Sequence, residues 1–328
     1  MEESQKLNWK EAFLKSPGPK TWKEAFALYM KGVAMGGADI IPGVSGGTIA
    51  LIVGIYEKLL QAIQSIDAKF IRKLLSFNIK EALSIIHIRF LVSLLAGIGT
   101  AVVGLSHVIH IFLNDFPVQT WAFFFGLILA SILIIGKSIT NWGSSGGSGF
   151  LFGTISGYIL VGLIPVQTPE TSWFIFLCGM IAICAMILPG ISGAFLLLVL
   201  GKYEYVTSAL KNPFLPSSIL IIITFGSGAL IGILAFSRLL NYLLKNYHNL
   251  TIAILTGLML GSLRKVWPWK EILETKLIRG KIHVLREANI LPVSYDSTFL
   301  LAIFLILIGF ILVLGLDKIA SNEKKGEL

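Results

Sequence analysis

The chain has 328 residues, of which 55% are hydrophobic and only 14% are charged, whereas a soluble domain carries roughly 25% charged residues. Its uncharged apolar runs of about 20 residues predict membrane-spanning helices, because backbone polar groups in lipid must pair within their own segment; a soluble all-α protein is excluded. The net charge of +9 comes from basic residues between the apolar runs, as positive-inside placement explains, so we also exclude nucleic acid as a partner.

The first 30 residues contain no continuous apolar core, so we predict no cleavable signal peptide there. The pattern Trp-Lys-Glu-Ala-Phe stands at residues 9–13 and again at residues 22–26. Tryptophan, phenylalanine and lysine at such spacing are typical of a helix that lies in the membrane interface, and we interpret residues 1–24 in this way. A solvated helical leader fits the same pattern, and both interpretations stay open.

The hydrophobic segment at residues 25–60 is interrupted by several glycines and one proline. Proline removes a backbone donor and clashes with the preceding turn, while glycine permits the chain to reverse. The arms on either side are too short to cross about 30 Å of hydrocarbon comfortably. We therefore predict a re-entrant helical hairpin hinged at Pro42, with its irregular backbone surrounded by protein or by a watery cavity.

Three apolar segments follow this first hairpin, and each predicts a membrane span. A second broken segment, hinged at Pro189, comes next, and three further apolar segments complete the chain. The expected spans are at about 89–113, 119–137, 149–164, 218–243, 250–265 and 298–316.

The two broken segments are copies of one motif. Residues 42–46 read Pro-Gly-Val-Ser-Gly and residues 189–193 read Pro-Gly-Ile-Ser-Gly, an offset of 147 residues. If the hairpins contribute no crossing, each copy crosses three times, and this odd number inverts the second copy relative to the first. We predict an all-α polytopic membrane protein with an inverted-topology duplication, about six full spans and two re-entrant pairs. Its parts are the interfacial segment 1–24, the first repeat 25–164, the second repeat 165–316 and the C-terminal tail 317–328.

The charge distribution favours a cytoplasmic N-terminus in a multi-pass protein, because most lysines and arginines then fall on the inner side. The outer loop at residues 264–297 disagrees with this rule, since it holds seven basic residues around Trp267 and Trp269. A basic loop that carries tryptophan fits contact with anionic lipid headgroups.

A helix that begins at mid-membrane presents unpaired N–H groups and the positive end of its dipole, and phosphate is commonly bound at such helix starts. Inverted symmetry would bring both breaks to one cavity near the midplane. The alternative is that the glycines only permit tight helix packing. The predicted phosphate-binding residues of the two breaks are Gly43, Ser45, Gly46, Gly47, Thr48, Gly190, Ser192 and Gly193.

Three acidic residues stand near the breaks, where a charge is expensive and so indicates function. Asp39 precedes the first break, and Met186 takes the matching place in the second copy, so the two halves are unequal. We predict that Asp39 carries a proton or anchors the break by a hydrogen bond. Glu57 and Glu204 follow the two breaks at matching places, either as coupling acids or as interfacial caps and ion-pair partners.

Three basic residues, Arg89, Lys137 and Arg238, stand at the ends of apolar runs. They are candidates for adding positive charge to the phosphate site. The alternative is that their long side chains reach out to the membrane interface.

The sequence predicts no metal site and no cofactor. Cys178 and Cys184 lie inside an apolar run without metal-ligand spacing, and they are too few for a disulfide framework. His107 and His110 lie one helical turn apart but have no carboxylate or thiol partner nearby in the sequence.

The broken segments, at residues 36–48 with the glycine and Tyr-Glu pair that follow, and at 188–193, resemble those of a membrane family formerly labelled only as a domain of unknown function. Its members are described as polyprenyl-phosphate translocases (PopT). The resemblance runs from about residue 25 to 316. It implies a protein of the bacterial plasma membrane that returns undecaprenyl phosphate from the outer to the inner leaflet for reuse in cell-envelope synthesis. The partners would be this lipid monophosphate, membrane lipids, and protons or another coupling ion.

Two other functions fit the pattern less well. Undecaprenyl-diphosphate phosphatases also look like inverted repeats with re-entrant hairpins and carry a similar Pro-Gly-x-Ser run. In those enzymes an arginine follows the serine, whereas Gly46 and Gly193 stand there in this chain. Phosphoryl chemistry depends on positioned cations or metal, so their absence from the motifs favours binding without cleavage. A small-anion transporter is the remaining alternative.

Overall fold

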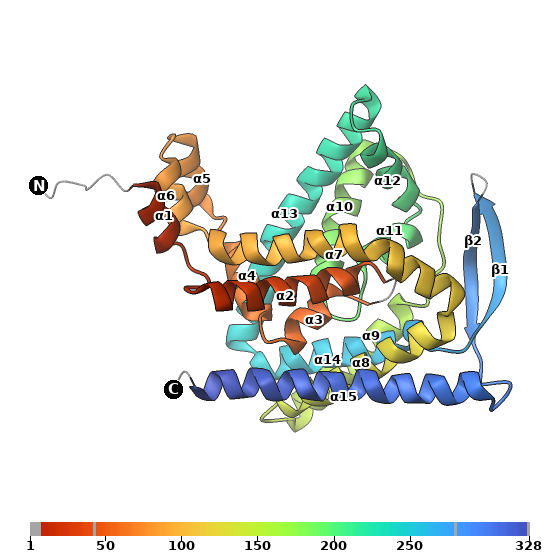
Figure 1. Cartoon of the computed structure of the whole chain (residues 1–328). Helices are drawn as coiled ribbons and strands as arrows, with labels where there is room; N and C mark the ends of the chain where they lie inside the picture. Colours follow the sequence, from red (N-terminus) through yellow and green to blue (C-terminus); the bar gives the residue numbers. More distant parts are fainter. Residues whose placement is uncertain (1–7, 42–43, 279–280, 327–328) are drawn as a thin grey trace, which may run out of the picture.

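A computed structural model describes residues 8–41, 44–278 and 281–326 of the chain, and almost all of its regular structure is helical (Figure 1). The repeated Trp-Lys-Glu-Ala-Phe pattern begins two successive helices, α1 (Trp9–Lys15) and α2 (Trp22–Asp39). The residue before each copy is the N-cap, since the side chains of Asn8 and Thr21 accept hydrogen bonds from the backbone N–H groups of the two glutamates. Each such cap stabilises its helix by about 1 kcal/mol.

The first half of the chain continues after α2 with short helices and then with three long ones. Ser45 caps α3 (Gly46–Ile52), and Gly54, with a φ of +69°, allows the turn into α4 (Tyr56–Gln64). The axes of α3 and α4 are bent by 117°. The remaining helices of this half are α5 (Ala68–Leu75), α6 (Ile79–Ile85), α7 (Ile88–Asp115), α8 (Pro117–Lys137) and α9 (Gly143–Leu160).

The second half repeats this order from a helix that ends at the second break. A long helix, α10 (Ser172–Ile187), leads to the short helix α11 (Gly193–Val199), and Gly201, with a φ of +65°, allows the turn into α12 (Tyr203–Lys211). Thus α10, α11 and α12 correspond in order to α2, α3 and α4. The helices α13 (Pro216–Asn246), α14 (His248–Val266) and α15 (Ser297–Gly326) then correspond to α7, α8 and α9.

The helix partners follow the same correspondence. The first two long helices of each half pack together, α2 with α7 and α10 with α13. The last two exchange partners between halves, so that α8 packs with α15 and α14 with α9. Gly126 of α8 and Gly257 of α14 stand at equivalent contacts, because a Cβ atom on either would lie 2.0–2.2 Å from a backbone oxygen of the partner helix, that of Ile306 or Phe150. Small residues allow such close packing in membranes.

Four helical stretches are long and apolar enough to cross a membrane: α7, α8, α13 and residues 297–318 of α15. The bent pair of α3 and α4 passes the same test when it is taken together. The other two expected spans, 149–164 and 250–265, form α9 and α14, but these helices are not among the four. A multi-pass membrane protein is therefore confirmed, while the number of six crossings stays a prediction.

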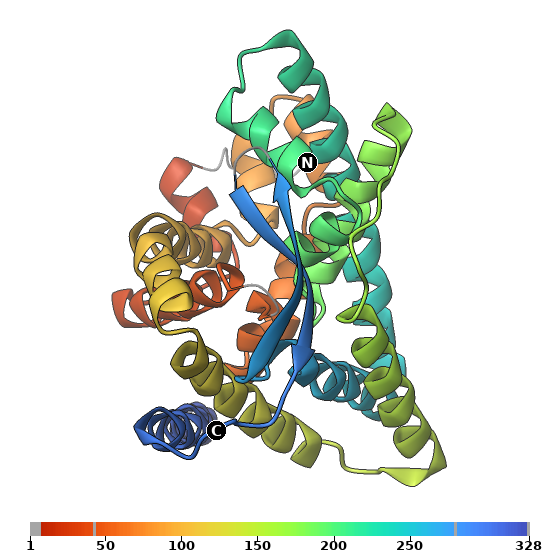
Figure 2. The same ribbon diagram turned by 90° about the vertical axis from the view of Figure 1, so that its right-hand side faces the viewer.

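The structure is mostly helical, as an all-α membrane protein requires, but the basic loop at residues 264–297 contains strands. An antiparallel pair of strands, β1 (Lys270–Ile278) and β2 (Lys281–Asn289), occupies most of it, with shifts of register around Glu274. The hairpin lies at the end of the molecule opposite α1 and the C-terminal end of α15 (Figure 1). Viewed onto that end, it runs across the middle of the molecule (Figure 2).

The exchanged packing of α8 and α15 predicts a sharp difference between two glycine substitutions. Gly126→Ala forces the two backbones apart and should lower the free energy of unfolding by about 1–3 kcal/mol, the usual cost of overpacking. Gly104→Ala on α7 is the matched control, since a Cβ atom there meets nothing within 4 Å. Thermal unfolding in detergent measures both. Equal melting temperatures for the two variants would contradict the close contact.

Candidate functional site

The two helix breaks are in direct contact. The Oγ atom of Ser45 lies 3.1 Å from the carbonyl oxygen of Met186 and 3.0 Å from that of Leu188, within hydrogen-bonding distance of both. These carbonyl groups belong to the end of α10, where the break leaves them without helical partners. A side chain at the first break thus satisfies backbone acceptors of the second break.

Two further hydrogen bonds cross the same contact. The backbone N–H of Gly190 donates to Oγ1 of Thr48 at 2.9 Å, and the hydroxyl of Tyr56 donates to the carbonyl oxygen of Ile187 at 3.1 Å. Thr48 is fully buried and Tyr56 nearly so. Because buried backbone groups need partners, these side chains stabilise the irregular backbone of the second break.

The donors at the start of α3 are engaged within the first break itself. The backbone N–H of Gly46 donates to Oδ1 of Asp39 at 2.7 Å, and that of Gly47 donates to Oγ of Ser45 at 3.1 Å. The carboxylate of Asp39 therefore lies where the sequence predicts a phosphate. Its roles as a proton carrier or as a hydrogen-bond anchor for the break stay predictions.

The glycines of the breaks allow the close approach of the two segments. A Cβ atom on Gly47 would lie 2.3 Å from the carbonyl oxygen of Ile187 in the second break. Gly193 allows close packing within the second break, since a Cβ atom on it would lie 2.4 Å from the carbonyl oxygen of Ala182 on α10. Gly190 has a φ of +82°, which side chains rarely adopt. Tight packing is thus one function of these glycines. The predicted hinge Pro42 and the predicted phosphate ligand Gly43 lie outside the described residues.

The second break differs from the first in its polar groups. Ser192 caps α11 by accepting a hydrogen bond from the N–H of Phe195 at 3.4 Å. Pro189 is buried beside it. Met186, which matches Asp39 in the motif, contributes only its backbone carbonyl to the contact, through the bond from Ser45. The two halves are therefore chemically unequal at the breaks.

The three predicted basic residues form hydrogen bonds elsewhere or face outward. Arg89 donates to the carbonyl oxygens of Ser16 and Pro19, and so fixes the connection between α1 and α2 onto the start of α7. Arg238 is exposed and lies 3.5 Å from the carbonyl oxygen of Ile66. Lys137 is exposed at the end of α8. No hydrogen bond in the described structure joins any of the three to a break, and their assignment to phosphate stays a prediction.

The two glutamates also lie away from the contact between the breaks, at the starts of short helices. Glu57 begins α4 beside Tyr56, and one of its carboxylate oxygens lies 4.0 Å from Nε2 of His248. Glu204 stands in the first turn of α12. Within the described residues, no group of three histidine, cysteine, aspartate or glutamate side chains forms a metal site.

An apolar cavity of about 240 Å³ lies directly beside the first break. It begins at Gly37 and Ala38, which precede Asp39, and continues along α3 past Ile49. Helices α7, α8 and α15 close its other sides, and all the side chains that line it are hydrocarbon or aromatic. This cavity could not be predicted from the sequence, because residues of five helices line it. The residues that line it from the end of α3 and from α8 and α15 include Ile52, Val53, Phe124, Leu127, Leu312 and Val313.

These features define a helical, multi-pass membrane protein with two broken helices in contact and a lipophilic cavity beside them.

A family model described as VCA0040-like, undecaprenyl phosphate translocase-like, matches residues 35–282. Two curated relatives carry the name polyprenyl-phosphate transporter. The one from Vibrio cholerae is 40% identical over 303 residues, and the one from Staphylococcus aureus is 31% identical over 310 residues; each alignment covers 90% of this chain and 97% of the relative. The chain belongs to this undecaprenyl phosphate translocase-like family. No solved structure matches it.

The bond between Thr48 and Gly190 predicts the effect of a shape-conserving substitution. Thr48→Val keeps the side-chain volume but leaves the buried N–H of Gly190 without an acceptor, which should cost about 1–3 kcal/mol of unfolding free energy. Thr48→Ser keeps the hydroxyl and should cost less. Thermal unfolding of both variants in detergent compares them, and a valine variant at least as stable as the serine variant would refute the bond.

Proposed function

We propose that this chain translocates a polyprenyl phosphate, namely undecaprenyl phosphate, from the outer to the inner leaflet of the bacterial plasma membrane. The names of its two relatives support the substrate class. The observation that carries the proposal is the position of the apolar cavity, which adjoins the polar groups of the first break. A lipid monophosphate needs such a pair of environments, one for its charged head and one for its hydrocarbon tail.

In this proposal the phosphate head is held at the two breaks and the tail begins in the cavity. The carboxylate of Asp39 and the phosphate compete for the N–H groups at the start of α3, since both are anions that accept from the same donors. Binding of the head therefore requires Asp39 to leave Gly46. Protonation of Asp39 weakens its hold on that N–H, and this couples a proton to the arrival of the phosphate.

The inverted arrangement of two repeats belongs to the same proposal. The corresponding helix order of residues 25–164 and 165–316, and the exchange of partners between α8, α9, α14 and α15, support it. In such transporters the substrate lies near the membrane midplane, where the repeats meet, and both membrane faces have access in turn. We place the end with α1 in the cytoplasm and the end with the hairpin outside.

Filling the cavity should block transport without disturbing the breaks. Gly37→Leu directs a side chain into the cavity, where the nearest atom to an added Cβ is 3.9 Å away. We expect uptake of a fluorescent polyprenyl phosphate into the inner leaflet of proteoliposomes to fall at least about tenfold, because losing the contacts of two buried methylenes costs about 1.6 kcal/mol. Gly104→Leu, at an open position on α7, is the control. If both variants transport at the wild-type rate, the tail does not use this cavity.

Coupling to protons is tested at Asp39. Asp39→Asn retains an oxygen that accepts from the N–H of Gly46, so the break stays formed, but the side chain no longer titrates. We expect wild-type transport in proteoliposomes to respond to an imposed pH gradient and the variant to lose that response. Asp67→Asn is the matched control, since Asp67 also accepts from a helix-start N–H, that of Phe70. Transport indifferent to both the gradient and Asp39→Asn would refute proton coupling.

A further inference from the structure

A second cleft, of about 560 Å³, lies at the hairpin end of the molecule, between the C-terminal end of α14 and strand β2. Arg264 and Trp267 contribute to it from the α14 side, and Arg286 and Asn289 contribute from β2. Tyr158, near the end of α9, lines it as well. The cleft therefore brings together two arginines that are 22 residues apart in the sequence.

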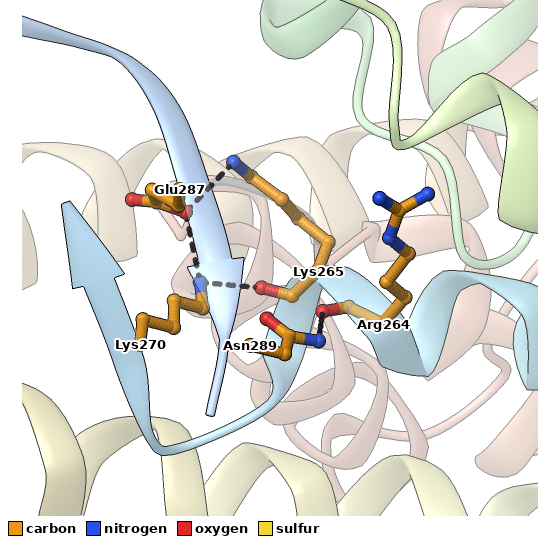
Figure 3. A network of polar contacts seen from close by, with 5 residues as sticks. All are labelled: Arg264, Lys265, Lys270, Glu287 and Asn289. Carbon is orange, nitrogen blue, oxygen red and sulfur yellow. Dashed lines mark hydrogen bonds and ion pairs between the residues drawn. The ribbon is translucent and has the colours of Figure 1, made fainter. Parts of the chain in front are cut away.

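The two lysines of this region form ion pairs with a carboxylate, whereas the two arginines do not. Nζ atoms of Lys265 and Lys270 each lie 3.3 Å from the same Glu287 oxygen (Figure 3). Burial is the largest influence on Lys270 and lowers its pKa to about 8, against the opposing attraction of Glu287. The two lysines thus share one carboxylate, and the two arginines of the cleft add two further positive charges beside it.

Arg264 and Arg286 are exposed, and neither has a carboxylate at ion-pair distance in the described part of the chain. The guanidinium of Arg264 stands clear of the lysine network in Figure 3 and lies over the ring of Tyr158, 4.4 Å from its centroid. Glu274 is opposite Arg286 in the strand register, but no ion pair joins them. Nη1 of Arg264 lies 3.5 Å from the carbonyl oxygen of Tyr158, a long hydrogen bond that leaves the other N–H groups of this guanidinium available. Two guanidinium groups with available donors at one cleft are suited to an oxyanion, especially phosphate, which arginine binds through paired hydrogen bonds.

The walls of the cleft are held together by hydrogen bonds in which the guanidinium groups take no part. The side-chain amide of Asn289 donates to the carbonyl oxygen of Arg264 at 2.8 Å, and the indole N–H of Trp267 donates to the carbonyl oxygen of Ile290 at 2.9 Å. Both bonds fix β2 to the end of α14. The cleft is thus preorganised, which reduces the ordering cost of binding.

The same end of the molecule exposes apolar side chains around the base of the hairpin. Ile272 and Leu273 on β1 are about half exposed, and Leu291 and Val293 after β2 are 79% and 90% exposed. Exposed apolar residues beside a cationic cleft fit a ligand with both an anionic head and a hydrocarbon part. This favours a lipid over a free anion.

Helix α14 connects this cleft to the second break. Gly261 and Arg264 face the cleft, whereas the neighbouring Ser262 faces Gly190, whose added Cβ would lie 2.7 Å from the Ser262 Oγ. Nζ of Lys265 also lies over the ring of Phe195 on α11, 5.4 Å from its centroid. Residues within about one turn of α14 thus contact the cationic cleft on one side and the second break on the other.

We propose that the cleft between α14 and β2 is a docking site for a lipid phosphate monoester, which Arg264 and Arg286 hold by its head at one membrane face before the head reaches the breaks. The role of this site in transport rests on the proposed function. Binding of the lipid phosphate at the cleft does not depend on that function and can be tested separately. The hairpin supplies half of the site, which gives a role to the basic segment that disagrees with the positive-inside rule.

The test is a titration of the full-length chain in detergent with farnesyl phosphate, followed by tryptophan fluorescence, since Trp267 lines the cleft. The Arg264→Gln and Arg286→Gln double variant should bind at least about tenfold more weakly, because hydrogen bonds to charged groups contribute about 1.5–3 kcal/mol each. Arg72→Gln, an exposed arginine of α5 at the other end of the molecule, should bind as the wild type does. Farnesol tests the need for the head, and inorganic phosphate tests the need for the tail.

The outcomes separate the two proposals. If the wild type binds farnesyl phosphate and the double variant binds it equally well, the cleft is not the docking site and the proposed function stands. If the wild type binds farnesyl phosphate no better than farnesol, no site selects the phosphate, and both proposals fail. If inorganic phosphate binds as tightly as farnesyl phosphate, the cleft takes a free anion and the lipid assignment is overturned.

Discussion

Each broken helix leaves backbone N–H and carbonyl groups without helical partners at a place where water does not compensate them, and the contact between the two breaks resolves this. Ser45 and Thr48 from the first break bond to the backbone around Leu188 and Gly190 in the second. Tyr56 adds a third hydroxyl to the same stretch. The second break thus depends on side chains of the first break to satisfy its backbone, which couples the folding of the two halves of the chain.

The rest of the architecture is arranged around this contact. The exchange of partners between α8, α9, α14 and α15 ties the halves together a second time, through backbones that approach at Gly126 and Gly257. Two of these helices, α8 and α15, also line the apolar cavity beside the first break, together with α2, α3 and α7. A rearrangement at the breaks would therefore reach the cavity directly, since α3 contributes to both.

The two halves place different polar groups at the breaks, and this difference determines the chemistry of the site. Asp39 places a carboxylate on the N–H of Gly46, whereas the matching Met186 offers only a carbonyl group. An internal anion at a helix start is a competitor for an external one, which is the basis of the proposed coupling. The cationic cleft lies on the α14 side, close to the break that lacks a carboxylate, and Glu287 at the cleft is paired with two lysines.

The sequence by itself determined that this is a membrane protein, where the two breaks lie, that they are copies of one motif, and where most of the helices lie. These features depend on local patterns, namely the length of apolar runs, the positions of proline and glycine, and a repeated motif. It also singled out Asp39, whose place before the break made it conspicuous. It did not reveal the hydrogen-bond partners of Arg89 and Arg238. A position at the end of an apolar run predicts how deep a side chain lies in the membrane, but not the direction in which it points. Only the tertiary structure decided that the breaks touch, that five helices enclose a cavity, and that β2 brings Arg286 to Arg264. Each of these joins residues that are distant in sequence, and local periodicity carries no information about such pairings.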